Sequence, residues 1–211
     1  FPYHETTTKS IKTPEFNILC IMSMDLTELK ATVKNCRKCP LYIHRRNVVP
    51  GEGAAGARLM FVGEAPGASE DEQGRPFVGA AGRLLTNALA QFSISRADVY
   101  ITNVVKCRPP GNRTPKREEI EACLPYLLKE IAIVKPSRII ALGLTSGKTL
   151  LKLIGKKATR LEDIRGMCHS GTFLGNRVEI CVTYHPAAVL RDPSLSEKFR
   201  EDLSKFTSVI S

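Results

Sequence analysis

The chain has 211 residues, of which 43% are hydrophobic and 25% charged, so it is long enough to bury one sizeable core. Its longest apolar runs fall well short of the roughly 18 residues that span a bilayer, which argues against a membrane protein. An excess of 31 Lys and Arg over 21 Asp and Glu gives a net charge of +10, which favours a polyanionic partner.

The N-terminal segment, residues 1–23, shows neither helical nor strand periodicity. We interpret it as a disordered or non-native extension of a single domain that spans residues 24–211. Residues 1–17 are polar and carry no visible secretory signal, so we expect a cytoplasmic protein. In a reducing cytoplasm, seven cysteines favour ligation of a metal or cluster over disulfides.

A helix is predicted from Asp25, because apolar residues recur there at helical spacing. It leads to Cys36 and Cys39 in a C-x-x-C arrangement, and Cys107 and Cys123 follow with fifteen residues between them. Four thiolates from two segments can enclose one zinc ion or one cubane iron-sulfur cluster, and spacing does not separate the two. Alternatively, one pair is ordinary buried cysteine. Three cysteines lack ligand spacing and are interpreted as core residues: Cys20, Cys168 and Cys181.

The apolar run at residues 59–62 stops at Gly63, which is typical of a strand buried on both faces. A long loop rich in Gly and Pro follows, and then a helix that ends near Phe92. In open α/β sheets, ligands bind where a strand end, a loop and a helix follow one another. The acidic residues 70–72 in this loop could hold magnesium, but we interpret them as a solvated loop with one member turned inward.

Strands and helices alternate through the rest of the chain, which predicts a three-layer α/β/α sandwich around a short, mostly parallel sheet. Thr114 and Pro115 are expected to begin the helix that follows the basic loop 108–117. Residues 143–149 resemble a phosphate-binding loop but have three residues between the glycines instead of four, so we interpret them as an ordinary turn. The remaining expected elements are strands at 98–103 and 138–142, a helix at 145–154, a hairpin at 172–183, a loop at 184–191 and a helix at 196–209.

Five motifs occur in one order: GEAPG with a trailing ED, GRPFVGxAGxLL, ITNVVKCRPPxNRxP, the four cysteines, and HPAAxLR. Together they resemble the family 4 uracil-DNA glycosylases, the iron-sulfur type found in thermophilic bacteria and archaea, from about Asp25 to the C-terminus. The resemblance implies the uracil-DNA glycosylase fold. It also implies a monofunctional enzyme that flips uracil out of DNA and hydrolyses its N-glycosidic bond, leaving an abasic site for base excision repair.

The same resemblance assigns a [4Fe-4S] cluster to Cys36, Cys39, Cys107 and Cys123, with a structural role beside the DNA. The segment between Cys107 and Cys123 contains no histidine. Because a related branch traps DNA covalently through a histidine in an inserted basic loop, ordinary turnover is expected here.

Three residues are expected to bind the flipped base. Phe77 matches the family position that stacks on uracil, and the Asn103 amide would donate to uracil O4 and accept from N3–H. Cytosine presents the reverse pattern and would leave both groups unpaired. His185 would hydrogen-bond uracil O2 and stabilise the departing base.

Water activation is the least familiar part of the expected site. The best-known uracil glycosylases have an aspartate where this chain has Ala65. Glu64 and loop carbonyls are therefore the candidates to orient water, and Glu70 is expected to close the pocket against the thymine methyl group. Gly63 and Ala65 complete the expected substrate-binding set.

The expected partner is uracil-containing DNA, single- or double-stranded. The protein is expected to be a monomer and not to bind a membrane. Two other functions stay open: a non-catalytic iron-sulfur protein that binds DNA or senses redox state, and a zinc-stabilised nucleotide hydrolase using Glu64, Glu70 and Asp71. The DNA is expected to be held or wedged by basic and apolar residues: Arg108, Arg113, Lys116, Arg117, Leu190 and Arg191.

Overall fold

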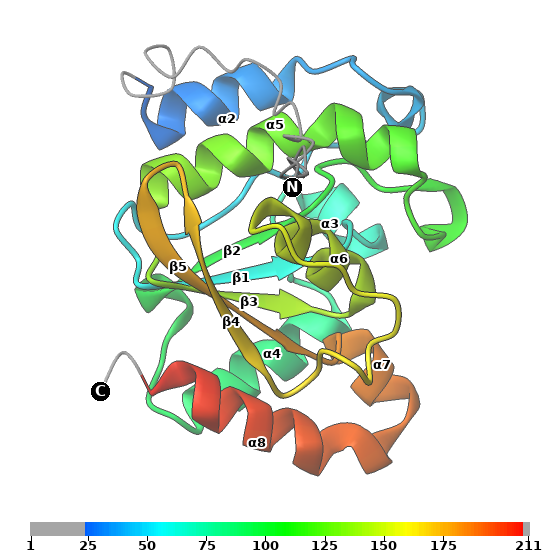
Figure 1. Cartoon of the computed structure of the whole chain (residues 1–211). Helices are drawn as coiled ribbons and strands as arrows, with labels where there is room; N and C mark the ends of the chain where they lie inside the picture. Colours follow the sequence, from blue (N-terminus) through cyan, green and yellow to red (C-terminus); the bar gives the residue numbers. More distant parts are fainter. Residues whose placement is uncertain (1–23, 209–211) are drawn as a thin grey trace, which may run out of the picture.

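The computed structural model describes residues 24–208. Within them, a five-stranded sheet has the order β2-β1-β3-β5-β4, and all neighbouring strands are parallel except β4 and β5 (Figure 1). This arrangement confirms the expected α/β class. The strands are β1 (Leu59–Gly63), β2 (Tyr100–Asn103), β3 (Arg138–Leu142), β4 (Cys168–Phe173) and β5 (Asn176–Thr183).

Helices cover both faces of the sheet and give three layers. Successive residues of β1 alternate between two cores, because strand side chains point to opposite faces. Met60 and Val62 pack with α2, α5 and α6, whereas Leu59 and Phe61 pack with α4, α7 and α8. The helices are α2 (Leu26–Lys34), α3 (Ala68–Gln73), α4 (Ala80–Ala90), α5 (Arg117–Val134), α6 (Leu144–Leu153), α7 (Pro186–Arg191) and α8 (Ser196–Thr207), with short 3₁₀ turns η1 (Pro40–Ile43), η2 (Arg96–Asp98), η3 (Pro110–Asn112) and η4 (Pro193–Leu195).

The acidic segment after β1 is a helix and not the solvated loop that the sequence analysis predicted. It forms α3, and two of its carboxylates, those of Glu70 and Asp71, are buried. Glu70 accepts hydrogen bonds from three backbone N–H groups, and Asp71 accepts from the N–H groups of Arg46 and Asn47 at 2.9 and 3.2 Å. Because backbone donors satisfy both carboxylates, both can turn inward.

Two other predicted boundaries were wrong. Helix α5 begins at Arg117 rather than at Thr114 and Pro115, because the Glu119 carboxylate accepts the Lys116 N–H at 2.7 Å and so places the cap there. Most of the predicted loop at 184–191 is α7, whose N-cap is His185.

A disulfide joins Cys168 to Cys181, so the interpretation of these two as separate core cysteines was wrong. The two residues are register partners in the antiparallel pair β4–β5, which brings their side chains together. Cys181 is buried, but Cys168 is exposed at its strand end. The predictions for Cys20 and for residues 1–23 lie outside the described residues.

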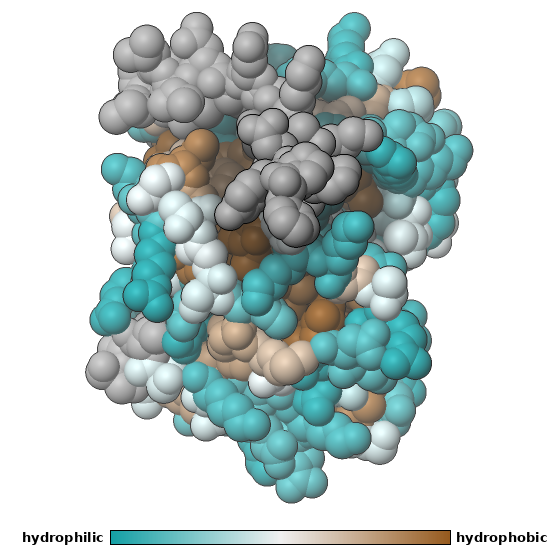
Figure 2. Space-filling view, viewed as in Figure 1, coloured by the Kyte–Doolittle hydropathy of each residue, from teal (hydrophilic) through white to brown (hydrophobic). Residues whose placement is uncertain are grey.

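Figure 2 shows the face of Figure 1 as mostly hydrophilic, with apolar side chains near its centre. None of the helices within residues 24–208 is both long enough and apolar enough to cross a membrane.

The disulfide leads to a stability prediction. Reducing the protein, or replacing Cys168 with Ser, should lower the free energy of unfolding by about 2–3 kcal/mol, because a cross-link over 13 residues restricts the unfolded chain. Urea unfolding with and without a thiol reductant measures this. The Cys168→Ser variant serves as the control, since its midpoint should not respond to the reductant in this way. An unchanged midpoint for the reduced parent protein would contradict the prediction.

Candidate active site

A cavity of about 740 Å³ opens at the carboxyl ends of the parallel strands. It lies where β1, β2, β3 and β5 end and the following loops begin, the usual ligand-binding edge of an open α/β sheet. The structure therefore brings together residues far apart in the sequence. Six of the predicted catalytic and base-binding residues line it: Glu64, Ala65, Glu70, Phe77, Asn103 and His185.

Gly63 supports the cavity through the side chain that it lacks. The sheet register places it beside Asn103, at the ends of β1 and β2. A Cβ atom at this position would lie 2.4 Å from Asn103 Oδ1 and 2.6 Å from the Phe77 ring. Any larger residue would have to displace one of these side chains. Only glycine therefore permits Asn103 and Phe77 to occupy their positions beside the end of β1.

Asn103 presents an unused hydrogen-bond acceptor to the cavity. Its side chain is 1% exposed, and Oδ1 has no hydrogen-bond partner in the part of the chain that the structure describes. Leaving a buried acceptor unpaired costs about 1–3 kcal/mol, so such an atom favours a ligand that carries an N–H donor.

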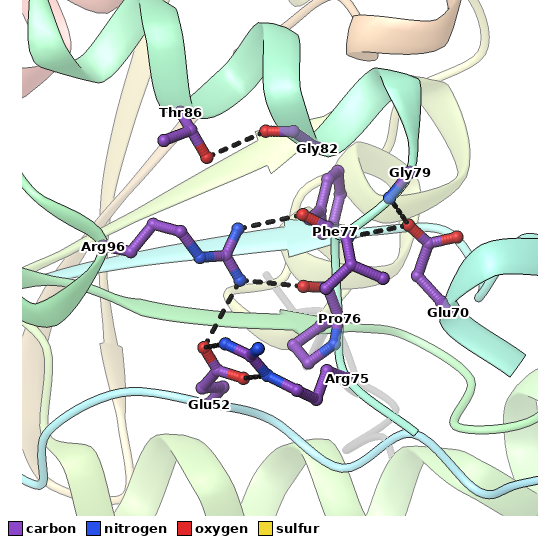
Figure 3. A network of polar contacts seen from close by, with 10 residues as sticks. Glu52, Glu70, Arg75, Pro76, Phe77, Gly79, Gly82, Thr86 and Arg96 are labelled. Atoms are coloured by element: carbon purple, nitrogen blue, oxygen red, sulfur yellow. Dashed lines mark hydrogen bonds and ion pairs between the residues drawn. The ribbon is translucent and has the colours of Figure 1, made fainter. Parts of the chain in front are cut away.

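Phe77 is held in a left-handed backbone conformation, with φ of 52°, which is unusual for a bulky residue. Figure 3 shows its loop fixed from two sides. The Arg96 guanidinium donates to the carbonyls of Pro76 and Phe77 at 2.8 and 3.0 Å. On the other side, Glu70 Oε1 accepts from the Val78 and Gly79 N–H groups at 2.9 and 2.8 Å. The surrounding contacts thus impose the ring position.

Two further contacts support this loop (Figure 3). A Cβ at Gly82 would lie 1.8 Å from the Phe77 carbonyl oxygen, so glycine is required where α4 passes under the loop. Glu52 lies 3.5 Å from Arg96 and also receives two hydrogen bonds of 2.8 Å from Arg75. Arg96 is therefore itself held in place.

His185 caps α7 in a way that determines its tautomer. Its Nδ1 accepts the Ala187 N–H at 3.1 Å, so in the neutral ring the proton lies on Nε2. Burial is the main cause that lowers the pKa of His185 to about 4; the positive charge of Arg191 acts in the same direction, and the carboxylate of Glu70 opposes them. At neutral pH the ring is an uncharged donor, with its centroid 5.7 Å from that of Phe77.

The half-buried Glu64 has one carboxylate oxygen fixed. Its Oε2 accepts the Thr145 hydroxyl at 2.5 Å, and both residues line the cavity. The sequence analysis missed Thr145. Its position in the first turn of α6, directly after β3, was the available signal, because strand ends in a parallel sheet share one edge.

The predicted DNA-binding residues divide into two groups. Arg113 and Arg191 line the cavity, and so does Lys148 of α6, which the sequence analysis missed. Arg113 is neutralised in part by two hydrogen bonds to Glu119, at 2.8 and 2.6 Å, which weakens its attraction for phosphate. The others lie outside the cavity lining: Arg108, Lys116, Arg117 and Leu190.

The four cysteines with ligand spacing line a second, small cavity between α2, the end of β2 and α5. Two sulfurs already accept hydrogen bonds: Cys107 from the Arg45 guanidinium at 3.0 Å, and Cys123 from the Lys106 N–H at 3.2 Å. Burial raises the pKa of Cys123 to about 12. As the side chains stand, no three Cys, His, Asp or Glu residues within 24–208 lie close enough to hold a single metal ion.

Comparison with known proteins identifies the family. Residues 50–207 match the family model of the uracil DNA glycosylase superfamily. The chain is 61% identical over 183 residues to a type-4 uracil-DNA glycosylase of Pyrobaculum aerophilum, covering 87% of this chain and 93% of that protein. It is 47% identical over 180 residues to a type-4 enzyme of Thermotoga maritima, covering 84% and 91%. The chain belongs to the type-4 branch of the uracil-DNA glycosylase superfamily.

A type-5 uracil-DNA glycosylase of Pyrobaculum aerophilum is more distant, at 32% identity over 80% of this chain and 78% of that protein. The superfamily match includes every cavity residue described above, as well as Cys107 and Cys123, but begins after Cys36 and Cys39. The cavity therefore lies within the part of the chain that the superfamily shares.

The environment of His185 predicts its titration. Its imidazole should titrate near pH 4 in the folded protein, below the ordinary value of 6.5. Because the folded pKa is lowered, the unfolded chain binds the proton first. This histidine therefore opposes folding increasingly as the pH falls from about 6.5 to about 4. Chemical shifts of the labelled ring measure the titration, with the urea-unfolded protein as control. A folded-state midpoint near 6.5 would contradict it.

Proposed function

We propose that this protein removes uracil from DNA by hydrolysing the N-glycosidic bond, as the names of its type-4 relatives state of them. The unpartnered Oδ1 of Asn103 carries the proposal. It is a buried acceptor in the cavity that is also lined by the Phe77 ring and by the neutral imidazole of His185. A flipped uracil supplies the N–H that this acceptor lacks.

Asn103 would distinguish uracil from cytosine by hydrogen-bond polarity. Uracil presents N3–H as a donor and O4 as an acceptor, which matches an amide that accepts through Oδ1 and donates through Nδ2. Cytosine has an unprotonated N3 and an amino group, so both of its groups would face the wrong partner. Each buried mismatch costs about 1–3 kcal/mol.

His185 would stabilise the departing base. When the bond between C1′ and N1 breaks, its electron pair leaves with uracil and the negative charge spreads to O2, while the sugar becomes positive. A proton on Nε2 can donate to O2 without a net positive charge on the ring. The hydrogen bond from Ala187 keeps the correct nitrogen protonated.

Glu64 would orient the attacking water. Thr145 occupies Oε2, so a water molecule can donate to Oε1, add its oxygen to C1′ and release its proton to the carboxylate. Glu70 would close the pocket against the thymine methyl group, as its motif position predicts, with both of its oxygens engaged by backbone donors. It lines the pocket as part of the Phe77 support.

A [4Fe-4S] cluster on Cys36, Cys39, Cys107 and Cys123 is proposed as well. Four thiols around one small cavity, two with hydrogen bonds to sulfur, suit such a cluster. A single zinc ion with 2.3 Å bonds would need the sulfurs about 3.8 Å apart, and no three Cys, His, Asp or Glu residues within 24–208 are set to hold one metal ion. When bound, the cluster would brace the segment after β2 and the C-x-x-C turn.

Excision should depend on the two base-contacting residues. Asn103→Ala and His185→Ala should each lower the single-turnover rate at uracil by at least about 100-fold, because each removes a contact to the base or leaving group. The substrate is a labelled duplex with one U·G mismatch, with alkali used to reveal abasic sites. Asn176→Ala, at the exposed first position of β5, is the matched control and should keep full activity.

A T·A duplex should stay intact throughout. If the parent protein folds and binds DNA but leaves the U·G strand uncut, the proposed function is wrong, and a non-catalytic DNA-binding role becomes the better account. Full activity in either variant would instead remove that residue alone from the mechanism.

The cluster has its own test. Anaerobically purified protein should be brown, absorb near about 400 nm and contain iron, and Cys123→Ala should lose this absorbance. Cys168→Ser, which changes a cysteine outside the small cavity, should keep it. Colourless protein with one zinc per chain would contradict the proposal.

A further inference from the structure

A buried ion pair, Lys106 with Glu130, lies next to the backbone of Asn103, and no step proposed above uses it. Both residues are 1% exposed, and Lys106 Nζ lies 2.6 Å from Glu130 Oε2. Removing two charges from water is unfavourable, and apolar residues of similar size often replace such a pair without loss of stability. The pair therefore calls for an explanation other than stability.

The three hydrogens of the Lys106 ammonium group are all used. Besides Glu130, Nζ donates to Thr102 Oγ1 at 2.6 Å and to the backbone carbonyl of Asn103 at 2.7 Å. The last contact matters most, since it fixes the peptide that carries the base-reading residue.

Glu130 anchors the lysine to β2 and to the segment that precedes β1. From α5, its carboxylate accepts the Gly51 N–H at 3.0 Å, the Tyr100 hydroxyl at 3.3 Å and the Thr102 hydroxyl at 2.9 Å. The ammonium group is thus held in a fixed place, and it can fix the Asn103 carbonyl in turn.

The segment between Asn103 and Cys107 also ties the two catalytic strands together. Its N–H groups donate from Val104 to the Gly63 carbonyl at 2.9 Å and from Val105 to the Glu64 carbonyl at 3.2 Å. The next N–H, that of Lys106, donates to Cys123 Sγ. This short segment therefore links Asn103 to Glu64 on one side and to the cysteine site on the other through its backbone hydrogen bonds.

We propose that Lys106, held by Glu130, is a positioning residue that fixes the Asn103 peptide so that its amide meets uracil. The inference rests on the proposed function and adds a residue to it. It also assigns the Lys106 side chain to the base-reading site. The complete burial of this side chain excludes a contact with DNA phosphate.

The test uses the double variant Lys106→Met with Glu130→Leu, which removes both charges and leaves neither one unpaired. The excision rate, the Kd for uncleaved DNA and inhibition by free uracil are measured together. We expect the rate to fall at least tenfold and the uracil inhibition constant to rise at least tenfold, with the DNA Kd within twofold of the parent value.

Tyr100→Phe is the matched control, since it removes a hydrogen bond to the same carboxylate without touching Asn103. It should keep the parent rate and uracil inhibition even where its melting temperature falls. If the double variant does not fold, Thr102→Val replaces it, because this change removes one of the three acceptors of the ammonium group. Its uracil inhibition should weaken measurably.

The inference would be overturned if the folded double variant kept the excision rate and the uracil inhibition of the parent. Where the double variant does not fold, the same result in Thr102→Val would overturn it. So would an equal loss in Tyr100→Phe, because a general loss of packing would then explain both. These outcomes presuppose a parent protein that excises uracil. Failure of the parent itself would reject the proposed function instead.

Discussion

The site depends on a missing side chain at the end of β1. The parallel register of β1 and β2 sets Gly63 beside Asn103, and a Cβ at Gly63 would collide with both the Asn103 amide oxygen and the Phe77 ring. With a Cβ at this point, the amide and the ring could not share the same wall of the cavity. The relative placement of the amide that we propose reads the base and the ring that we propose stacks on it is thus set by backbone geometry, before any ligand enters.

Buried carboxylates hold the surrounding backbone in place. Glu70 fixes the loop that presents Phe77, and Glu130 fixes the lysine under Asn103. Asp202 of α8 likewise accepts two hydrogen bonds from Arg165 and one from Thr183, at the end of β5 just before His185. Glu64 differs, because it is half-buried and its hydrogen bond with Thr145 uses one carboxylate oxygen only. These three carboxylates therefore hold backbone or side chains in place, whereas Glu64 keeps an oxygen for the role proposed above.

Hydrophobic periodicity and strand-end chemistry predicted much of this from sequence. Buried strands at β1 and β3 read as continuous apolar runs, and Asn103 and His185 follow strands, so both the sheet and the meeting of these residues at one edge could be inferred. The start of α5 could not be inferred, because Thr114 and Pro115 are the stronger sequence signal, whereas the hydrogen bond between the Lys116 N–H and the Glu119 carboxylate decides the cap. The pairing of Cys168 with Cys181 depends on hairpin register, which sequence alone does not fix.

Contacts across the fold were likewise hidden. Thr145 and Lys148 look like ordinary residues of a helix, and their position at the cavity follows only from where β3 ends. Lys106 reads as one more basic residue in a basic chain, yet it is fully buried. The pairing of Arg113 with Glu119 also lowers its value as a phosphate ligand below what its motif position predicted.

The central claim is that the Asn103 amide reads the base, and the ratio of uracil to cytosine excision in Asn103→Asp tests it most directly. A carboxylate cannot donate to uracil O4, so the account predicts at least a tenfold loss at uracil and a clear fall in the preference for uracil over cytosine. A folded Asn103→Asp variant that excises uracil at the parent rate and still rejects cytosine to the same degree would contradict it.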